Sequence, residues 1–289
     1  MLNFFTARMT PEVRAVQVLN KRCLVLGSLF RATLRRFGYE LSQYPITNWE
    51  MRPYQLRNSI VEVLTSLQIN CILDVGANEG QYANLLRSFG YAGRIISFEP
   101  VSTTYNRLAQ QSSSDPNWAV HNCAVGSCNG SLEMNIMDGD QFSSLLSLNS
   151  YGRTQFPTQT RVARTERVNV VRLDSIMDAL TAGLDEPKIF LKIDTQGYDL
   201  EVVDGAAGCV GSILGLQSEI ALRPIYEKMP NYLTSLTKLN ELGFSITSLV
   251  PVSRDSDLRV IEFDCFLVRT ELAGMSGSPT KTANCAGPT

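Results

Sequence analysis

Histidine is almost absent from this sequence, because His121 is the only one among 289 residues. The seven cysteines are scattered and none forms a C-x-x-C pair, so the chain offers no Cys/His set for a structural zinc ion. Most of the cysteines lie inside apolar strings, where a free thiol behaves as a small hydrophobic side chain. Free thiols are typical of a reducing compartment, and we therefore expect a cytoplasmic protein.

The sequence also has no long hydrophobic run and no excess of charge of one sign. The longest apolar run near the N-terminus, Cys23 to Phe30, is far shorter than the roughly 20 residues of a membrane-spanning helix. No small-residue cleavage pattern follows it, which argues against a signal peptide. Lys and Arg number 26 against 28 Asp and Glu, a net charge of −2, which excludes the basic excess of a nucleic-acid-binding protein. We expect no nucleic-acid partner.

Charge is nevertheless distributed unevenly along the chain. Residues 1–57 carry nine basic and three acidic side chains, and the rest of the chain is acidic. Residues 13–39 have apolar residues at three- and four-residue spacing, which predicts a basic amphipathic helix. Such a helix packs against the main domain or a subunit partner, the interpretation we favour, or else lies on the inner, anionic face of a membrane. We expect three segments: a basic helical extension (1–54), one domain (55–270) and a disordered tail (271–289).

From residue 55 onward, stretches with helical spacing alternate with short apolar runs. The runs at 71–75, 94–98 and 189–193 are nearly unbroken, as in strands buried on both faces. This alternation predicts an α/β fold with a mainly parallel sheet, helices on both faces, and ligands at the carboxyl ends of the strands. The C-terminal part has a hairpin-like pattern that adds antiparallel edge strands. Further expected strands are 118–125, 132–136, 167–172, 215–220, 245–252 and 265–268, and expected helices are 56–67, 80–89, 104–111, 174–182, 199–205 and 232–242.

A loop with two glycines follows the first strand and opens a helix. Gly76 and Gly80 allow the backbone to turn tightly and to approach a ligand closely. Asp74, at the end of the strand, is placed to accept hydrogen bonds or to pair with a cation. Glu99 follows the second strand at the same sheet edge, where one carboxylate can accept hydrogen bonds from both hydroxyls of a ribose.

Two nucleoside cofactors fit this arrangement. A dinucleotide site requires G-x-G-x-x-G, but here the spacing is G-x-x-x-G with Asn78 in the loop, and Asp74 would repel phosphate. S-adenosylmethionine has no phosphate and carries an ammonium and a sulfonium group, which acidic side chains attract. We therefore favour S-adenosylmethionine, and a loop without a ligand is the remaining alternative. The candidate cofactor-binding residues are Asp74, Gly76, Ala77, Asn78, Gly80, Gln81, Glu99, Pro100, Asn122 and Ala124.

The loop and several later strings resemble the FkbM-type methyltransferase family, in the same order and over about residues 20–270. The strings are 73–108, 120–126, 143–146, 170–174, 190–198 and 216–220. The resemblance implies a class I, Rossmann-like methyltransferase that uses S-adenosylmethionine. Known members are generally O-methyltransferases that act on sugar hydroxyls of glycolipids, polysaccharides and Nod-factor-like molecules, or on polyketide natural products. Thr195 and Asp199 depart from the family pattern, in which a hydrophobic residue and Glu are commoner.

Methyl transfer to a hydroxyl requires an aligned acceptor and a group that takes its proton. We expect Asp194, which ends the strand 189–193, to accept the proton or orient the hydroxyl, with Glu219 from the next strand assisting. Alternatively, both residues cap helices or pair with Lys192 or Arg223. His121 lies inside an expected strand, and we interpret it as a structural residue or part of the cofactor wall. Mg²⁺ held by Asp194, Asp199 and Glu219 is a further alternative, but no ligand spacing compels it and we assign no metal.

The acceptor site is marked less clearly in the sequence. Ser143, Ser144 and Tyr226 are the candidate residues, and Tyr226 either stacks on a sugar or packs inside the domain. Residues 142–172 carry five arginines against one acid, which indicates either a lid for a phosphorylated acceptor or a solvated face. We expect the acceptor to be a hydroxyl on a sugar of a glycan, a glycolipid or a secondary metabolite. The alternatives are a nitrogen or non-sugar acceptor, or a catalytically silent scaffold at a membrane surface.

Overall fold

The structure is a computed structural model that describes residues 48–137, 143–157 and 161–270. The helix expected over residues 13–39 and the tail expected at 271–289 lie outside the described residues. The chain divides into two units, 1–51 and 52–289, and all the described strands lie in the second. Within the described ranges, no helix has the length and apolar character needed to cross a membrane.

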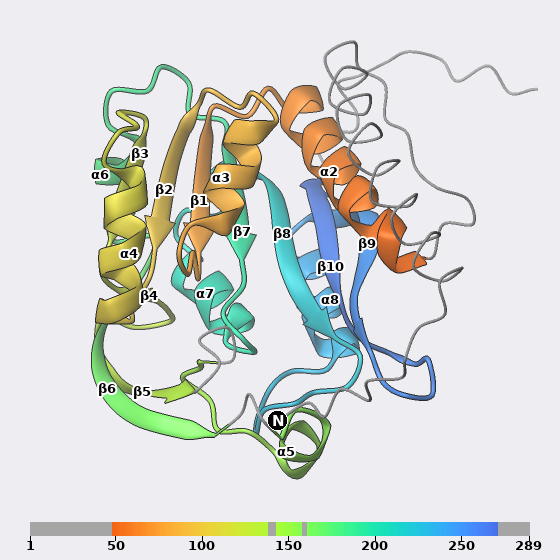
Figure 1. Cartoon of the computed structure of the whole chain (residues 1–289). Coiled ribbons are helices and arrows are strands. Elements are labelled where there is room, and N and C mark those ends of the chain that lie inside the picture. The colour runs from red at the N-terminus through yellow and green to blue at the C-terminus, as the bar shows by residue number, and fades with distance from the viewer. Residues whose placement is uncertain (1–47, 138–142, 158–160, 271–289) are drawn as a thin grey trace, which may run out of the picture. The chain divides into compact units, whose positions relative to one another are not determined.

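The centre of the domain is a seven-stranded sheet in the order β3-β2-β1-β7-β8-β10-β9 (Figure 1). Neighbours from β3 to β8 run parallel, whereas β10 pairs antiparallel with both β8 and β9. The mainly parallel sheet with antiparallel strands at its C-terminal end is therefore confirmed. The strands are β1 (Cys71–Val75), β2 (Arg94–Phe98), β3 (Trp118–His121), β7 (Ile189–Ile193), β8 (Ile213–Ala221), β9 (Phe244–Arg254) and β10 (Val260–Arg269).

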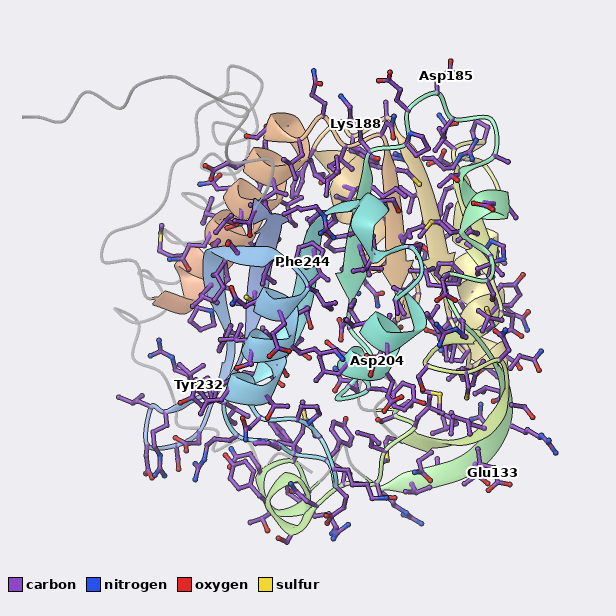
Figure 2. The ribbon with its side chains drawn as sticks, turned by 180° about the vertical axis from the view of Figure 1, so that it is seen from behind. Glu133, Asp185, Lys188, Asp204, Tyr232 and Phe244 are labelled. Carbon is purple, nitrogen blue, oxygen red and sulfur yellow. The ribbon has the colours of Figure 1, made fainter. Side chains whose placement is uncertain are left out.

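Helices cover both faces of this sheet, each burying an apolar stripe against it. On one face, side chains of α2 (Asn48–Ser66), α3 (Gln81–Ser88) and α4 (Ser102–Ser112) share a core with β1 and β2. On the opposite face, which Figure 2 shows, α6 (Met177–Thr181), α7 (Asp199–Gly205) and α8 (Tyr232–Glu241) form a second core. The fold is the predicted Rossmann-like α/β class with helices on both faces.

Two expectations about element boundaries need correction. Helix α2 begins at Asn48, earlier than the helix expected at 56–67, and includes Pro53. Its buried side chains include Ile60, Val63 and Leu64, whereas Val61 is 37% exposed. The helical spacing of the apolar residues is therefore present, with the buried stripe along one side of the helix.

The single strand expected at 118–125 is two strands in two sheets. After β3 the chain turns, because the Asn122 side-chain amide donates to the carbonyls of Glu99 and Pro100. The following strand β4 (Ala124–Val125) pairs with β6 (Val162–Val171), which also pairs with β5 (Gly130–Met137). Along the chain, the strands of this three-stranded sheet and the short helix α5 (Ser150–Gln155) come between β3 and α6.

The strand order creates a crevice between β1 and β7. From β1 the chain builds β2 and β3 on one side, and it later returns to the other side of β1 as β7. Ligands of open parallel sheets bind outside the carboxyl ends of the strands at such a switch point. The loops after β1, β2, β7 and β8 all reach this edge, so residues distant in sequence meet there.

Candidate functional site

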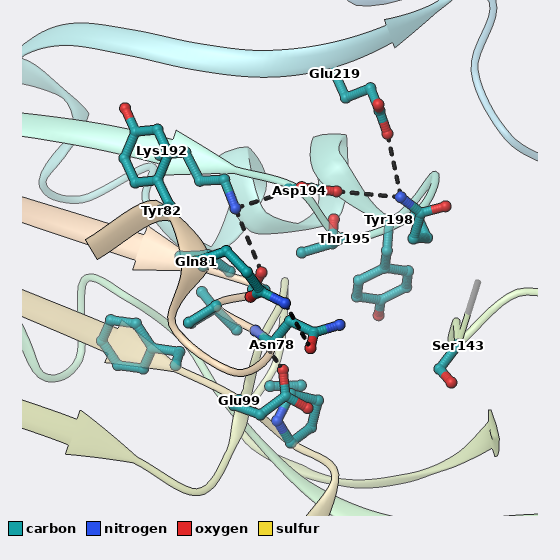
Figure 3. Close-up of a pocket in the computed structure, with 18 of the residues that line it drawn as sticks. Asn78, Gln81, Tyr82, Glu99, Ser143, Lys192, Asp194, Thr195, Tyr198 and Glu219 are labelled. Carbon is teal, nitrogen blue, oxygen red and sulfur yellow. Dashed lines mark hydrogen bonds and ion pairs between the residues drawn. The ribbon is translucent and has the colours of Figure 1, made fainter. Parts of the chain in front are cut away.

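A cavity of about 450 Å³ lies at the switch point (Figure 3). Its lining spans the sheet, and β7 divides it into two sides. We call the side that lies over the ends of β1 and β2 the β2 side, and the side beyond β7, toward α2, the β10 side. The β2 side includes Gly76, Ala77, Asn78, Glu99, Pro100 and Ala124, and the β10 side includes Arg52, Leu56, Gln217, Glu219, Val252 and Asp264.

The two glycines of the first loop have different roles. Gly76 lines the cavity with a φ of +77°, and a Cβ there would lie 1.9 Å from the carbonyl oxygen of Asp194. Only glycine therefore allows the loop to pass β7 so closely. Gly80 has a φ of +89°, but its missing Cβ makes room for the Trp118 ring. Gly80 is thus a packing position and not part of the cavity wall, whereas its neighbour Gln81 does line the cavity.

Glu99 is held in place by backbone amides at the end of β2. Its Oε2 accepts from the Asn78 N–H and its Oε1 from the Val101 N–H, both at 2.9 Å. The side chain lines the cavity although the residue is only 6% exposed. Burial raises the pKa of Glu99 to about 7, against the lowering effect of these two amides. Each carboxylate oxygen retains a lone pair, so Glu99 can accept from a pair of ligand hydroxyls.

Asp74, expected as a cofactor contact, is fully buried and does not line the cavity. It belongs to a polar row in which Ser97, Asp74, Lys192 and Gln217 are register neighbours across β2, β1, β7 and β8. Ser97 Oγ donates to Asp74 Oδ2 at 3.3 Å, and Lys192 Nζ lies 3.2 Å from Asp74 Oδ1. Asp74 is therefore paired with Lys192 beneath the loop, a partner that the argument about phosphate repulsion did not include.

Lys192 is the central side chain of the site, and from the sequence we considered it only as a partner of Asp194 or Glu219. Its Nζ also lies 3.4 Å from Asp194 Oδ2, 3.3 Å from the Gly76 carbonyl oxygen and 5.4 Å from the centre of the Tyr82 ring. Burial alone lowers the pKa of Lys192, but the carboxylates of Asp74 and Asp194 outweigh it and raise the pKa above its usual value. A lysine inside an otherwise apolar parallel strand was the available signal, since such a charge requires a buried partner.

Asp194 and Glu219 come together at the ends of β7 and β8 through one amide group (Figure 3). Gln196 Nε2 donates to Asp194 Oδ1 and to Glu219 Oε2, each at 3.1 Å. Gln196 adopts a left-handed φ of +52°, which is unfavourable for a side chain of this size. Burial, together with the carboxylates of Glu262 and Asp194, raises the pKa of Glu219 well above its usual value. Glu219 therefore retains a proton more readily than an ordinary glutamate.

The three candidate acceptor residues have different positions. Ser143 lines the cavity. Ser144 and Tyr226 are 0% and 1% exposed and do not reach it, so Tyr226 cannot stack on a sugar as we had considered. Instead, the Tyr226 hydroxyl donates to Gln196 Oε1 at 3.0 Å, and Ser144 Oγ donates to the Gln196 carbonyl at 2.8 Å. Both residues hold the loop that joins the two carboxylates.

Thr195 and Asp199, which depart from the family pattern, contact each other. The Asp199 carboxylate accepts from the backbone and side chain of Thr195, and Ser218 Oγ donates to it at 2.7 Å. Asp199 is therefore not directed at the same point as Asp194 and Glu219, as a shared Mg²⁺ would require. In the described part of the chain, no group of three or more His, Cys, Asp or Glu side chains is arranged to hold a metal ion.

The remaining sequence candidates lie outside the cavity. The His121 ring stacks on Phe98, which lines the cavity, with ring centroids 5.3 Å apart, and burial lowers the pKa of His121. The Asn122 amide is used by the turn after β3, so it does not face a ligand. The five arginines of residues 142–172 do not line the cavity: Arg164 pairs with Glu166 and Arg172 with Asp174. The expected pairing of Asp194 with Lys192 is present, whereas Arg223 pairs with Asp255.

Solved structures to which this chain is similar at low sequence identity include three methyltransferases. One is magnesium protoporphyrin IX methyltransferase from Synechocystis PCC 6803 with bound S-adenosylmethionine (11% identity, TM-score 0.42, covering 85% of this chain and 96% of that one). Another is Aeropyrum pernix fibrillarin with natively bound S-adenosyl-L-methionine (14%, 0.39, 74% and 76%). A third is an rRNA methylase from Streptococcus thermophilus (10%, 0.39, 78% and 99%).

Comparison with curated proteins gave no match. The methyltransferase FkbM domain, by contrast, matches residues 74–246, which is more than half of the chain. The match begins at Asp74 and includes the Gly76 loop, Glu99, Asp194 and Glu219, so it contains the whole switch-point edge of the sheet. The chain belongs to the FkbM methyltransferase family and is an S-adenosylmethionine-dependent methyltransferase.

Proposed function

We propose that the protein transfers a methyl group from S-adenosylmethionine to a hydroxyl group on a sugar of a glycan, a glycolipid or a secondary metabolite. The observation that carries this proposal is the pair of carboxylates, Asp194 and Glu219, that line the cavity directly beside the β2 side. A hydroxyl is a weak nucleophile and must lose its proton during transfer, so it requires such a group nearby.

The residues of the β2 side fit the cofactor. Glu99 has lone pairs for the ribose hydroxyls, and Gly76 brings the backbone close to the ligand. Carboxyl groups outnumber cationic side chains in the described lining by four to two, and those that are ionised favour a ligand with a sulfonium charge; the carboxyl groups are those of Glu99, Asp194, Glu219 and Asp264, and the cations are Arg52 and Lys192. When bound, the cofactor supplies an electrophilic methyl group, and the chain has to orient the acceptor and manage its proton.

Asp194 is the proton acceptor in this proposal. Its Oδ2 forms the ion pair with Lys192, and its Oδ1 accepts from Gln196, so both oxygens are fixed in position at the cavity wall. Glu219 retains its proton more readily, and it can therefore donate a hydrogen bond to the acceptor oxygen as well as accept one. The two carboxylates thus have different roles, with Asp194 removing the proton and Glu219 orienting the hydroxyl.

The first test is the variant Asp194→Asn, which keeps the shape of the side chain and removes the base. We expect turnover to fall by about 10²- to 10⁴-fold. The dissociation constant for S-adenosylmethionine, measured by calorimetry, should stay unchanged. The matched control is Glu133→Gln, which alters an exposed carboxylate on β5 away from the cavity. Wild-type turnover in Asp194→Asn would contradict the role of Asp194.

The second test identifies the acceptor. The purified protein and methyl-labelled S-adenosylmethionine are added to glycolipids, polysaccharides and small metabolites from source cells in which the gene is deleted. We expect label in an O-methyl sugar, identified by hydrolysis and mass spectrometry. Label on nitrogen or on a non-sugar hydroxyl would contradict the proposed acceptor. Failure to bind S-adenosylmethionine at all would favour a catalytically silent scaffold.

A further inference from the structure

The β10 side of the cavity contains a set of polar side chains that the proposed proton transfer does not use. Glu219 and Asp264 are register partners on β8 and β10, so they project from the same face of the sheet. Gln217 precedes Glu219 by two residues and shares this face. Helix α2 covers the same face (Figure 1). Its residue Arg52 reaches Asp264. Four polar side chains from three elements therefore meet beside Asp194.

These side chains are oriented by a chain of hydrogen bonds. The Tyr82 hydroxyl donates to Gln217 Oε1 at 2.9 Å, and Gln217 Nε2 donates to Asp264 Oδ1 at 2.9 Å. Arg52 Nη2 lies 3.3 Å from Asp264 Oδ2 and completes the chain. Because Tyr82 can only donate to the amide oxygen, it fixes the orientation of the Gln217 amide. These hydrogen bonds hold the side chains in a prearranged polar surface, in contrast to mobile surface charges.

One donor on this surface lacks a partner among the described residues. Arg52 Nε is buried and makes no hydrogen bond to them, whereas the Arg52 side chain as a whole is 33% exposed and lines the cavity. A buried N–H without an acceptor is costly, and ligand binding is one way to satisfy it. The neighbouring lining residues Leu56 and Val252 are apolar and can contact the C–H groups of a ring. A ligand oxygen beside an apolar ring face matches both features.

The charges on the β10 side disfavour an anionic ligand. The positive charge of Arg52 is paired with Asp264, and that of Lys192 with Asp74 and Asp194. Glu219 adds a further carboxyl group, whose pKa is already raised by burial and by neighbouring carboxylates, and Glu262 lies on the same face two residues before Asp264, where it accepts from Ser253 Oγ. Among the described residues that line the cavity, no unpaired cation is present to meet a phosphate, sulfate or uronate, and the arginines of residues 142–172 do not line it.

We propose that the β10 side is the acceptor site, that it selects an uncharged sugar, and that Arg52 is a specificity-determining residue. The Arg52 guanidinium donates to an oxygen of the sugar, and Asp264 and Glu219 accept from its hydroxyls. This inference rests on the proposed function, because it names the class of acceptor for the same reaction. It also gives Arg52 a role separate from cofactor binding, since the paired Asp264 disfavours the carboxylate of S-adenosylmethionine at this position.

The test measures sugar binding without methyl transfer. Saturation-transfer NMR is recorded on the full chain saturated with S-adenosylhomocysteine, using methyl glycosides of neutral hexoses and 6-deoxyhexoses as probes. The matching hexuronic acid and hexose phosphate are the charged comparison probes. We expect at least one neutral glycoside to bind and the charged probes to bind more weakly. Tighter binding of the charged probes, or binding by none of the glycosides, would overturn the proposal.

Variants assign the effect to Arg52. In Arg52→Gln we expect the affinity for the neutral glycoside to fall at least tenfold, while calorimetry gives an unchanged dissociation constant for S-adenosylmethionine. Arg57→Gln is the matched control, because Arg57 lies on the same helix, stacks over Phe89 and does not line the cavity. Should Arg52→Gln instead weaken cofactor binding, Arg52 serves the cofactor and the proposal fails. Asp264→Asn, which keeps its shape, repeats the test at the partner of Arg52.

Failure of this inference is distinguishable from failure of the proposed function. If glycosides bind as expected but the labelled methyl group appears on nitrogen, the site stands and the O-methyltransferase proposal fails. If an O-methyl sugar forms but Arg52→Gln leaves its KM unchanged, the reaction stands and the specificity role of Arg52 is overturned. Circular dichroism spectra and thermal midpoints of the variants, compared with the wild type, show whether each variant is folded.

Discussion

The two sides of the cavity are built in different ways. The β2 side is formed largely by one continuous segment, residues 75–104, in which the Asn78 and Val101 amides fix Glu99. The β10 side is assembled from side chains of residues 52, 217 and 264, which lie on a helix and two strands far apart in sequence. The first side depends on backbone geometry and the second on side-chain chemistry. Acceptor preference can therefore be altered by substitutions that leave the cofactor loop intact.

Lys192 is the residue at which the two sides meet. It bonds to the Gly76 carbonyl under the cofactor loop and pairs with Asp194 next to the acceptor site. The buried row from Ser97 through Asp74 to Lys192 thus supports both sides at once. A substitution here should affect the two sides together, whereas substitutions on either side should affect one function only. The predictions below test that distinction.

The largest effect is expected for Lys192→Met, which has similar length but no charge. It leaves Asp74 fully buried without its ion-pair partner, and Asp74 Oδ1 has no well-aligned hydrogen bond to replace that partner. We expect the free energy of unfolding to fall by about 3–5 kcal/mol, the usual cost of breaking a buried pair. Urea denaturation monitored by fluorescence measures this change. Both cofactor affinity and turnover should decline as well.

The matched control for this prediction is the double variant Asp74→Asn with Lys192→Met. It removes both charges, so it should recover a large part of the stability lost in Lys192→Met alone. If the double variant is as unstable as the sum of the two single variants, Lys192 and Asp74 act independently. The buried row would then be a poor explanation for how the two sides are held together.

The contrast between the two sides also explains what the sequence could predict. Strand β7 and helix α7 match their predicted bounds, because central parallel strands are unbroken apolar runs and their polar ends are abrupt. The positions of Gly76, Glu99, Asp194 and Glu219 at one sheet edge follow from the same pattern. The cofactor side was thus largely predictable, since its residues follow consecutive strands.

The β10 side was not predictable, because it depends on register and on burial. Nothing local to Gln217 or Asp264 indicates that they face Arg52; the antiparallel pairing of β10 with β8 brings them together. Asp74 was misinterpreted as a ligand contact because its buried partner Lys192 lies 118 positions later. Tyr226 was a candidate for the acceptor site, whereas it is buried and contacts Gln196. Such errors concern the direction of a side chain, which periodicity does not fix for residues at the ends of strands.

A smaller effect, confined to the β2 side, is expected for Glu99→Gln. The variant keeps the shape but loses the charge that strengthens hydrogen bonds from ribose hydroxyls, worth about 1.5–3 kcal/mol. Affinity for S-adenosylmethionine should therefore fall by about ten- to a hundredfold in calorimetry. Affinity of the β10 side for neutral glycosides should not change. A loss of glycoside binding in Glu99→Gln would break the separation between the two sides.

The pKa of Glu99 adds a pH dependence to the same measurement. Burial raises this pKa to about 7, and hydrogen bonds from the ribose favour the ionised form. The cofactor therefore binds best above pH 7, and its affinity should fall as the pH decreases through 7 because binding then requires loss of a proton. Glu99→Gln is the control: it retains any pH dependence from the cofactor's own amine and lacks the part due to Glu99. Identical pH profiles for the two proteins would contradict the assignment.

The smallest effect is expected for Tyr226→Phe, which acts at the boundary between the two sides. It removes the hydroxyl that donates to Gln196 Oε1 and thereby fixes which end of that amide faces Asp194 and Glu219. We expect a loss of about 1 kcal/mol in unfolding free energy, typical of one hydrogen bond, and a several-fold lower kcat. The dissociation constant for S-adenosylmethionine should not change, because no residue of the β2 side is held in place by Gln196.

Gln196→Glu replaces the donating amide with a carboxylate beside two others, so its kcat should fall further than that of Tyr226→Phe. If Tyr226→Phe lowers stability but leaves kcat and its pH profile unchanged, Tyr226 only packs inside the domain and does not orient the Gln196 amide.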